Sequence, residues 1–237
     1  MNKVVYGIKN TELDGLTDSL VRAFKADEKA QGNSFLSANM AALEEQSALI
    51  TTAILQDKAL STLDEADSKR DGAITSLGAV LKGYAAFPIA AKKEAAAPLL
   101  AVYEKYSKAG ITKAAYIAES SMVESMLGDF AADSLKDHIA ALDGVAQAIA
   151  AVREAQDAFT AASDAYTKAS ASKGASASSY KKPILALIND KLVPYLNAMQ
   201  IADDADIREF AKVAEAEITR VNEAVAKRNG KKSAAGE

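Results

Sequence analysis

The 237-residue sequence contains no cysteine and no tryptophan, and it has only one histidine, four prolines and twelve glycines. Without cysteine the chain forms no disulfide, no zinc–thiolate site, no iron–sulfur cluster and no thiol nucleophile. A single histidine also excludes the paired Glu-x-x-His motifs of di-iron bundles. The fold must therefore rest on a hydrophobic core alone. A chain of this length is sufficient, because it buries roughly 70% of its unfolded surface.

Common enzyme motifs are also missing. The sequence has no Gly-x-Ser-x-Gly nucleophile elbow, no glycine-rich phosphate loop ending in Gly-Lys-Ser/Thr, and no Rossmann glycine spacing. Adjacent acids such as Glu44-Glu45 diverge on a helix and make poor acid/base pairs. We therefore predict a protein that is not an enzyme and that binds no cofactor and no metal ion.

The sequence has no excess of positive charge. The formal net charge is −4 and the pI is near 5.3, so the protein as a whole has no basic field that attracts nucleic acid. This argues against a nucleic-acid partner. An exception is a group of cations near the C-terminus, formed by Lys227, Arg228, Lys231 and Lys232. These side chains could contact phosphates in a salt-sensitive way, or they could only complement a helix dipole.

Long apolar runs are absent. No segment approaches the roughly 18 consecutive apolar residues of a membrane span, and the longest run, residues 95–103, includes Pro98. The first seven residues lack the continuous apolar stretch of a secretory signal. We therefore expect no membrane span and a cytoplasmic location, although a secreted form whose signal has been removed would have the same composition.

Alanine and other helix formers dominate the residues that are present. Of the 237 residues, 52 are alanine, and apolar residues recur every three or four positions along most of the chain. One such stripe comprises Leu36, Met40, Leu43, Ser47, Ile50 and Ile54. No stretch shows the alternation of a β-hairpin. The pattern predicts an all-α protein, an elongated antiparallel bundle of about seven to eight coiled-coil-like helices without a sheet.

The same pattern predicts the domain organisation. The first helix is expected to begin near Thr11, so residues 1–10 form an N-terminal extension and residues 11–228 a single bundle domain. Within this domain the Ser/Ala-rich segment 168–179 is expected to be a mobile connection. Residues 229–237 are expected to form a flexible basic tail.

Glycine, proline and capping residues predict where helices end. Two separate helices are predicted over residues 34–54 and 61–86, and the longest helix over residues 133–169. Three prolines each either kink or end a helix, and the sequence leaves this choice open for Pro88, Pro98 and Pro194.

Charged residues occupy apolar positions in two of the predicted helices. In residues 60–77 the stripe passes through Asp67 and Arg70, and Glu119 takes an equivalent position in a later helix. Because an unpaired buried charge is costly, we expect Arg70 to pair with Glu119 and with Asp67. The simplest interpretation is a structural polar layer that fixes the helix register. The alternatives are that these residues line a ligand or metal pocket, or that they are exposed to solvent.

These positions also carry a family resemblance. The features concerned are two short motifs and two residues of a later helix: Asp67-x-x-Arg70-Asp71, Tyr116-x-x-Glu119-Ser120, Ala155 and Phe159. Over about residues 11–228 the sequence resembles a helical protein family of unknown function found mainly in Bacteroidetes. Some members of that family carry automatic haemagglutinin-type labels. The resemblance implies an all-helical bacterial protein and supplies no catalytic residue.

The expected function follows from the alanine-rich stripes. Alanine lets helix axes approach closely but removes little apolar area from water, so many contacts are needed and one face is often left uncovered. We expect a non-enzymatic helical scaffold or protein-interaction module that self-associates or binds another protein. The alternatives are a carrier of a small apolar ligand in the bundle interior, and a nucleic-acid accessory protein acting through the basic C-terminal tail.

Overall fold

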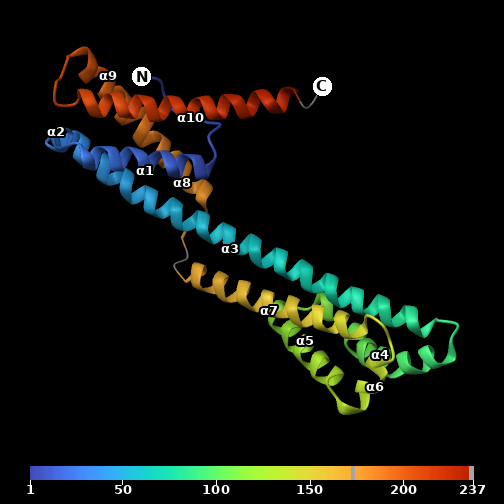
Figure 1. The fold of residues 1–237 in the computed structure, drawn as a ribbon. Coiled ribbons are helices and arrows are strands. Elements are labelled where there is room, and N and C mark those ends of the chain that lie inside the picture. The colour runs from blue at the N-terminus through green and yellow to red at the C-terminus, as the bar shows by residue number, and fades with distance from the viewer. Residues whose placement is uncertain (172–173, 235–237) are drawn as a thin grey trace. The chain divides into compact units, whose positions relative to one another are not determined.

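The computed structural model describes the backbone of residues 1–171 and 174–234 and the side chains of residues 1–171 and 174–230. Over these residues the chain forms helices joined by turns, and no β-strand occurs in this part of the chain (Figure 1). The predicted all-α class is therefore confirmed. None of the helices in the described segments is both long and apolar enough to cross a membrane.

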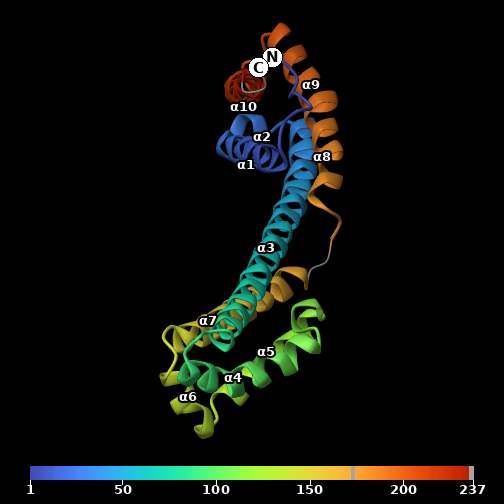
Figure 2. The same ribbon diagram turned by 90° about the vertical axis from the view of Figure 1, so that its right-hand side faces the viewer.

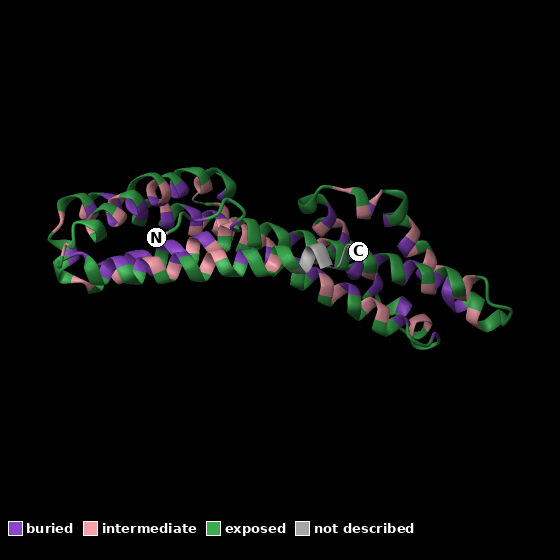
Figure 3. Cartoon of the chain, turned by 90° about the horizontal axis from the view of Figure 1, so that it is seen from above, coloured by how far each residue is buried: buried purple, intermediate pink, exposed green. Residues whose placement is uncertain are grey.

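The helices form two compact units. Unit 1 comprises residues 1–58 and 169–237, and unit 2 comprises residues 59–168. The sequence predicted instead a single bundle domain over residues 11–228. The difference arises because α3 (Ser34–Ala85) contributes apolar residues to two separate cores, one for each unit. Figure 3 shows that buried residues lie on the helix faces that meet one another and exposed residues on the outer faces.

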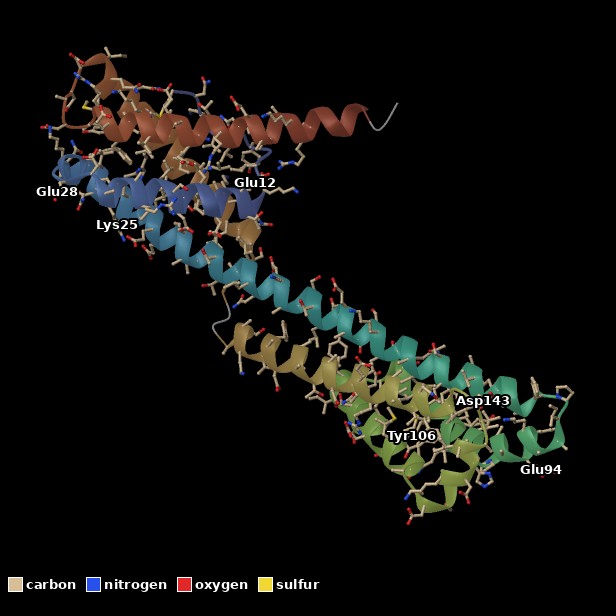
Figure 4. The ribbon with its side chains drawn as sticks, in the orientation of Figure 1. Glu12, Lys25, Glu28, Glu94, Tyr106 and Asp143 are labelled. Atoms are coloured by element: carbon tan, nitrogen blue, oxygen red, sulfur yellow. The ribbon has the colours of Figure 1, made fainter. Side chains whose placement is uncertain are left out.

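Unit 1 contains antiparallel helices. Glu12, at the start of α1 (Figure 4), pairs with Arg228 near the end of α10, and Phe24 packs against Phe210 with ring centroids 5.7 Å apart. The two helices therefore run in opposite directions, as Figure 1 shows. Figure 2 views α10 nearly along its axis. Besides the first part of α3, unit 1 contains α1 (Asn10–Ala26), α2 (Glu28–Gln31), α8 (Ala177–Ala186), the π-helical segment η3 (Leu187–Leu192), α9 (Val193–Ile201) and α10 (Arg208–Ala234).

Unit 2 packs the second part of α3 against later helices. Tyr84 near the end of α3 donates a hydrogen bond of 2.8 Å to the carbonyl of Asp143, just before α7, whereas Leu63 clusters with Phe159 within α7. Helices α3 and α7 are therefore antiparallel. The elements of unit 2 after α3 are α4 (Ala90–Lys108), η1 (Ile111–Lys113), α5 (Tyr116–Phe130), η2 (Asp133–Leu135), α6 (Lys136–Ala140) and α7 (Val145–Ser170).

Helix α3 is one continuous helix of 52 residues, so the prediction of two helices over residues 34–54 and 61–86 is wrong. Its start is as predicted, since the Asn33 side chain accepts a 3.0 Å hydrogen bond from the Leu36 amide. Residues 55–60 contain no glycine or proline and consist largely of good helix formers. The apolar stripe is interrupted there because the residues before and after it pack into different cores, while the helix itself continues.

The predicted long helix over residues 133–169 is interrupted. Short helices η2 and α6 come first, and α7 begins only at Val145. The preceding Gly144 has φ = 81°, in the left-handed region that ends a helix and that glycine adopts at little cost.

The prolines behave differently from one another. Pro88 lies in the turn after α3, whereas α4 continues through Pro98. Before Pro194 the helix widens into the π-helical segment η3. A local π-helical adjustment accommodates the missing proline N–H without ending the helix.

The predicted extension at the N-terminus is part of the core of unit 1. Val4 and Ile8 are buried there among residues of α1, α8, α9 and α10. Burying these apolar side chains removes their surface from water and stabilises the packed segment. An extension without contacts to the core would leave them exposed.

The two other predicted flexible segments each include helical residues. Helix α7 continues to Ser170 and α8 begins at Ala177, so both ends of segment 168–179 are helical. Residues 172–173 lie outside the described residues. Helix α10 passes Gly230 and continues to Ala234, into the predicted tail. Residues 235–237 lie outside the described residues.

Candidate functional site

The side chain of Arg70 is the centre of a buried polar cluster in unit 2. It projects from α3 and is 0% exposed. Nη2 donates to the carboxylate of Asp67, one turn earlier, at 2.7 Å, and it lies 2.9 Å from Oε2 of Glu119 on α5. The structure therefore brings together all three residues of the predicted polar layer.

The other terminal nitrogen of Arg70 connects α5 and α7. Nη1 donates to Oγ of Ser120 at 2.9 Å and to Oε1 of Gln156 at 3.2 Å. The guanidinium carbon lies 3.6 Å from the ring centroid of Phe159. Hydrogen bonds to a charged donor and a cation–π contact are among the stronger polar interactions in a protein. One arginine side chain therefore ties three helices together.

An aromatic pair borders this cluster. Tyr116 at the start of α5 donates a 3.0 Å hydrogen bond to Asp64 of α3. Its ring meets the ring of Phe159 edge to face, with centroids 5.3 Å apart. This contact keeps Phe159 in place beneath the guanidinium of Arg70.

Three carboxyl groups surround the single guanidinium. Burial raises the pKa of Glu119 to about 7, although nearby Arg70 acts in the opposite direction, and a hydrogen bond with Asp71 raises the pKa further. Burial also raises the pKa of Asp71. Oε1 of Glu119 and Oδ1 of Asp71 are buried and have no other hydrogen-bond partner in the described structure. Protonation of one of these carboxyls would lower the negative charge around the single guanidinium.

We expect the stability of the protein to fall as the pH rises from 4.5 to about 7. The folded state holds the Glu119 proton more tightly than the unfolded chain, because its pKa is raised from 4.5 to about 7. This contribution is fully present below pH 4.5 and is lost through about pH 7, and it is on the order of 3 kcal/mol. Chemical denaturation across this pH range measures it.

The control for this prediction is Glu119→Gln, which cannot titrate at this position. The difference between the two stability curves isolates Glu119 from the other acids. The same slope in both proteins would show that Glu119 titrates with an ordinary pKa.

The geometry of the cluster favours a structural role. The side chains of Arg70 and Glu119 are 0% and 3% exposed, so neither can touch a molecule in solvent without the helices separating. Within the described residues, no group of three or more histidine and acidic side chains is placed to hold a metal ion. Separating Arg70 from Glu119 would leave a buried group without its ion-pair partner, so the cluster favours one register of α3 and α5.

A surface groove runs along the α3–α7 seam of the same unit. Its volume is about 480 Å³. Glu65 and Lys69 of α3 and Glu154 of α7 are exposed on its rim. Most of the groove is lined by small side chains, namely Ala66, Ala73, Ala151, Ala155, Ala158 and Ala162. This is the accessible concave surface next to the buried cluster.

The four predicted phosphate-contacting cations lie at the end of α10 in unit 1. The guanidinium of Arg228 pairs with Glu12 and donates to the carbonyl of Gly7 at 2.7 Å, so it is already engaged within the protein. Lys227 is exposed. The side chains of Lys231 and Lys232 lie outside the described residues.

The sequence analysis missed three members of the cluster: Asp71, Ser120 and Gln156. Gln156 had a usable signal, because it stands between Val152 and Phe159 at helical spacing, in the position of a buried apolar residue. Asp71 and Ser120 follow directly after Arg70 and Glu119. They lie off the stripe, so only the three-dimensional packing brings them into the cluster.

Comparison with known proteins identifies the family. A family of unknown function, DUF6261, matches residues 60–215, which is more than half of the chain. The protein belongs to DUF6261. The DUF6261 match is shorter than the resemblance expected over residues 11–228, and it includes the polar cluster and the groove. No curated protein and no solved structure matches the chain.

Proposed function

We propose that this DUF6261 protein is a non-enzymatic helical scaffold, located in the cytoplasm, that associates with a second copy of itself through the α3–α7 groove. The composition of the groove carries the proposal. Its alanine floor allows a third helix to approach closely, because interaxial distance depends on the side chains at the contact. Its rim provides charges of both signs.

The two charged rim residues of α3, Glu65 and Lys69, can pair with the same two residues of a second copy. In an antiparallel pair of α3 helices, with a twofold axis midway between Glu65 and Lys69, each Glu65 faces the Lys69 of the other copy. Within the described part of the chain neither side chain forms an ion pair. Both are therefore available to a partner, and the arrangement favours a second copy as that partner.

Reversing one rim charge is expected to weaken self-association about tenfold. Lys69→Glu replaces two attractive contacts across the twofold axis with two repulsive ones, and each exposed pair contributes up to about 1 kcal/mol. Sedimentation equilibrium of both proteins measures the change in dimer dissociation constant.

The double variant Glu65→Lys, Lys69→Glu is the matched control. It exchanges the two charges and restores the complementary pairs, so its dissociation constant is expected to return close to that of the wild type. Equal association by the wild type, Lys69→Glu and the double variant would refute an α3–α3 interface.

The alternative functions have less support. The groove is open along the protein surface, whereas a carrier of a small apolar ligand needs an enclosed interior. A nucleic-acid accessory function would require free cations on α10, and Arg228 is engaged by Glu12. The Bacteroidetes range and haemagglutinin-type labels of the resembled family play no part in the proposal, since they identify no residue.

A further inference from the structure

Three asparagine side chains of unit 1 hold the main chain of the N-terminal segment. Asn189 of η3, Asn197 of α9 and Asn222 of α10 each both accept and donate a hydrogen bond to main-chain atoms of this segment. Residues 1–5 themselves form no helix. The segment is therefore bound by side chains that come from three different elements.

The hydrogen bonds have the pattern of recognition of an extended peptide. Asn189 accepts from the Val4 amide at 2.7 Å and donates to the Val4 carbonyl at 2.9 Å. The N–H and C=O of one residue point the same way only in an extended conformation, as in a β-ladder. This asparagine thus takes the place of a neighbouring strand.

The other two asparagines contact the main chain of residues 1, 3 and 5. Asn222 accepts from the amide of Val5 at 3.0 Å and donates to the carbonyl of Lys3 at 2.9 Å. Asn197 accepts from the Met1 nitrogen at 2.6 Å and donates to the Met1 carbonyl at 3.2 Å. Five of the six contacts are to peptide N–H and C=O groups, and the sixth is to the ammonium group of Met1.

Apolar side chains supply the remaining contacts. Val4 and Ile8 are 3% and 1% exposed, whereas Val5 and Tyr6 between them are 39% and 70% exposed. The site therefore selects a segment that is extended over residues 1–5, turns at residues 6–7, and places apolar side chains at its fourth and eighth positions. It tolerates variation at the intervening exposed positions.

We propose that this asparagine-lined site is a peptide-binding site that accepts residues 1–8 from a second copy of the chain in exchange for its own. The main-chain contacts are the same whichever copy supplies the segment, so exchange conserves them and its cost is mainly the entropy of association. Tyr6 and Gly7 form the turn between the extended residues 1–5 and Ile8, and the exchanged segment joins α1 through Lys9. This association uses unit 1 and is separate from the α3–α7 groove.

A peptide with the sequence of residues 1–8 provides the first test, with full-length proteins. Val4→Asp weakens the resident segment by placing a charge in the core, which leaves the site open to the peptide. We expect the peptide to raise the melting temperature of Val4→Asp in a dose-dependent way and to bind it about tenfold or more tightly than the wild type, whose own segment competes intramolecularly. Val4→Ala, a milder change, is measured in parallel so that a folded variant is available.

The matched control adds Asn189→Ala and Asn222→Ala to the Val4 variant, which removes the hydrogen-bonding side chains but not the apolar pocket. The peptide is expected to have no effect on this protein. A peptide that stabilises neither Val4 variant, or that stabilises the control equally, would overturn the peptide site.

Mixing two full-length variants tests the exchange itself. One carries the weakened segment (Val4→Asp) and the other the altered site (Asn189→Ala, Asn222→Ala), and both carry Lys69→Glu to suppress association through the groove. We expect a one-to-one complex by light scattering from the mixture and from neither variant alone. Peptide binding without such a complex would overturn the second copy as the ligand, while leaving the proposed scaffold function to its own test.

Discussion

Replacing Arg70 with alanine is expected to lower the free energy of unfolding by about 3–5 kcal/mol. The substitution leaves Glu119, which is buried, without its cationic partner, and it removes the hydrogen bonds to Ser120 and Gln156. It also leaves a space above the ring of Phe159 that the surrounding helices cannot easily fill. Urea denaturation followed by circular dichroism measures the loss.

An apolar replacement of the pair is the control for this effect. The double variant Arg70→Met, Glu119→Leu removes both buried charges and keeps most of the side-chain volume. Asp67 and Asp71 are only partly buried and can keep their charge with the help of solvent. We expect most of the stability lost in Arg70→Ala to return. If both variants unfold like the wild type, the cluster does not stabilise the fold.

Replacing Gly78 with alanine is expected to destabilise unit 2 by about 1–3 kcal/mol. Gly78 is in α3, and an added Cβ would overlap the ring of Tyr103 on α4. Tyr103 is 7% exposed, so its ring can move only by disturbing other core side chains. The close approach of α3 and α4 therefore depends on the missing side chain. Thermal and urea denaturation measure the effect.

Two other glycines of the same helix provide matched controls. A Cβ at Gly72 or Gly83 would meet no atom within 4 Å. Alanine at either position is expected to stabilise α3 by up to about 1 kcal/mol, because it is the better helix former. Tyr103→Leu in the Gly78→Ala background is expected to recover part of the loss. A Gly78→Ala variant as stable as the Gly72→Ala and Gly83→Ala variants would show that the helices are less tightly packed.

The apolar spacing predicted the helical class and the starts of α1 and α3, but not where helices join or divide. The interruption of the stripe after Ile54 looked like a break, although the helix-forming residues that follow carry α3 on. At Gly144 the error was the reverse. The apolar stripe continues on both sides of this residue and predicted one helix, but Gly144 adopts a left-handed conformation just before α7. Periodicity identifies which face is buried. It does not show against which core that face packs.

Only those members of the polar cluster that occupy apolar positions could be predicted from the sequence. Asp67, Arg70 and Glu119 occupy apolar positions, and burial forces such charges to find one another. Asp71 and Ser120 belong to the two short motifs of the family resemblance, but they do not interrupt a stripe, so the apolar spacing did not place them in the cluster. The asparagine-lined site in unit 1 was missed because its ligands are main-chain atoms, which leave no pattern of side chains.

The molar mass of the wild-type protein at micromolar concentration tests the central claim most directly. If the chain works as a self-associating scaffold, light scattering is expected to give about twice the monomer mass of 24.8 kDa, with a decrease toward that mass on dilution. A mass of 24.8 kDa at every concentration would contradict the account.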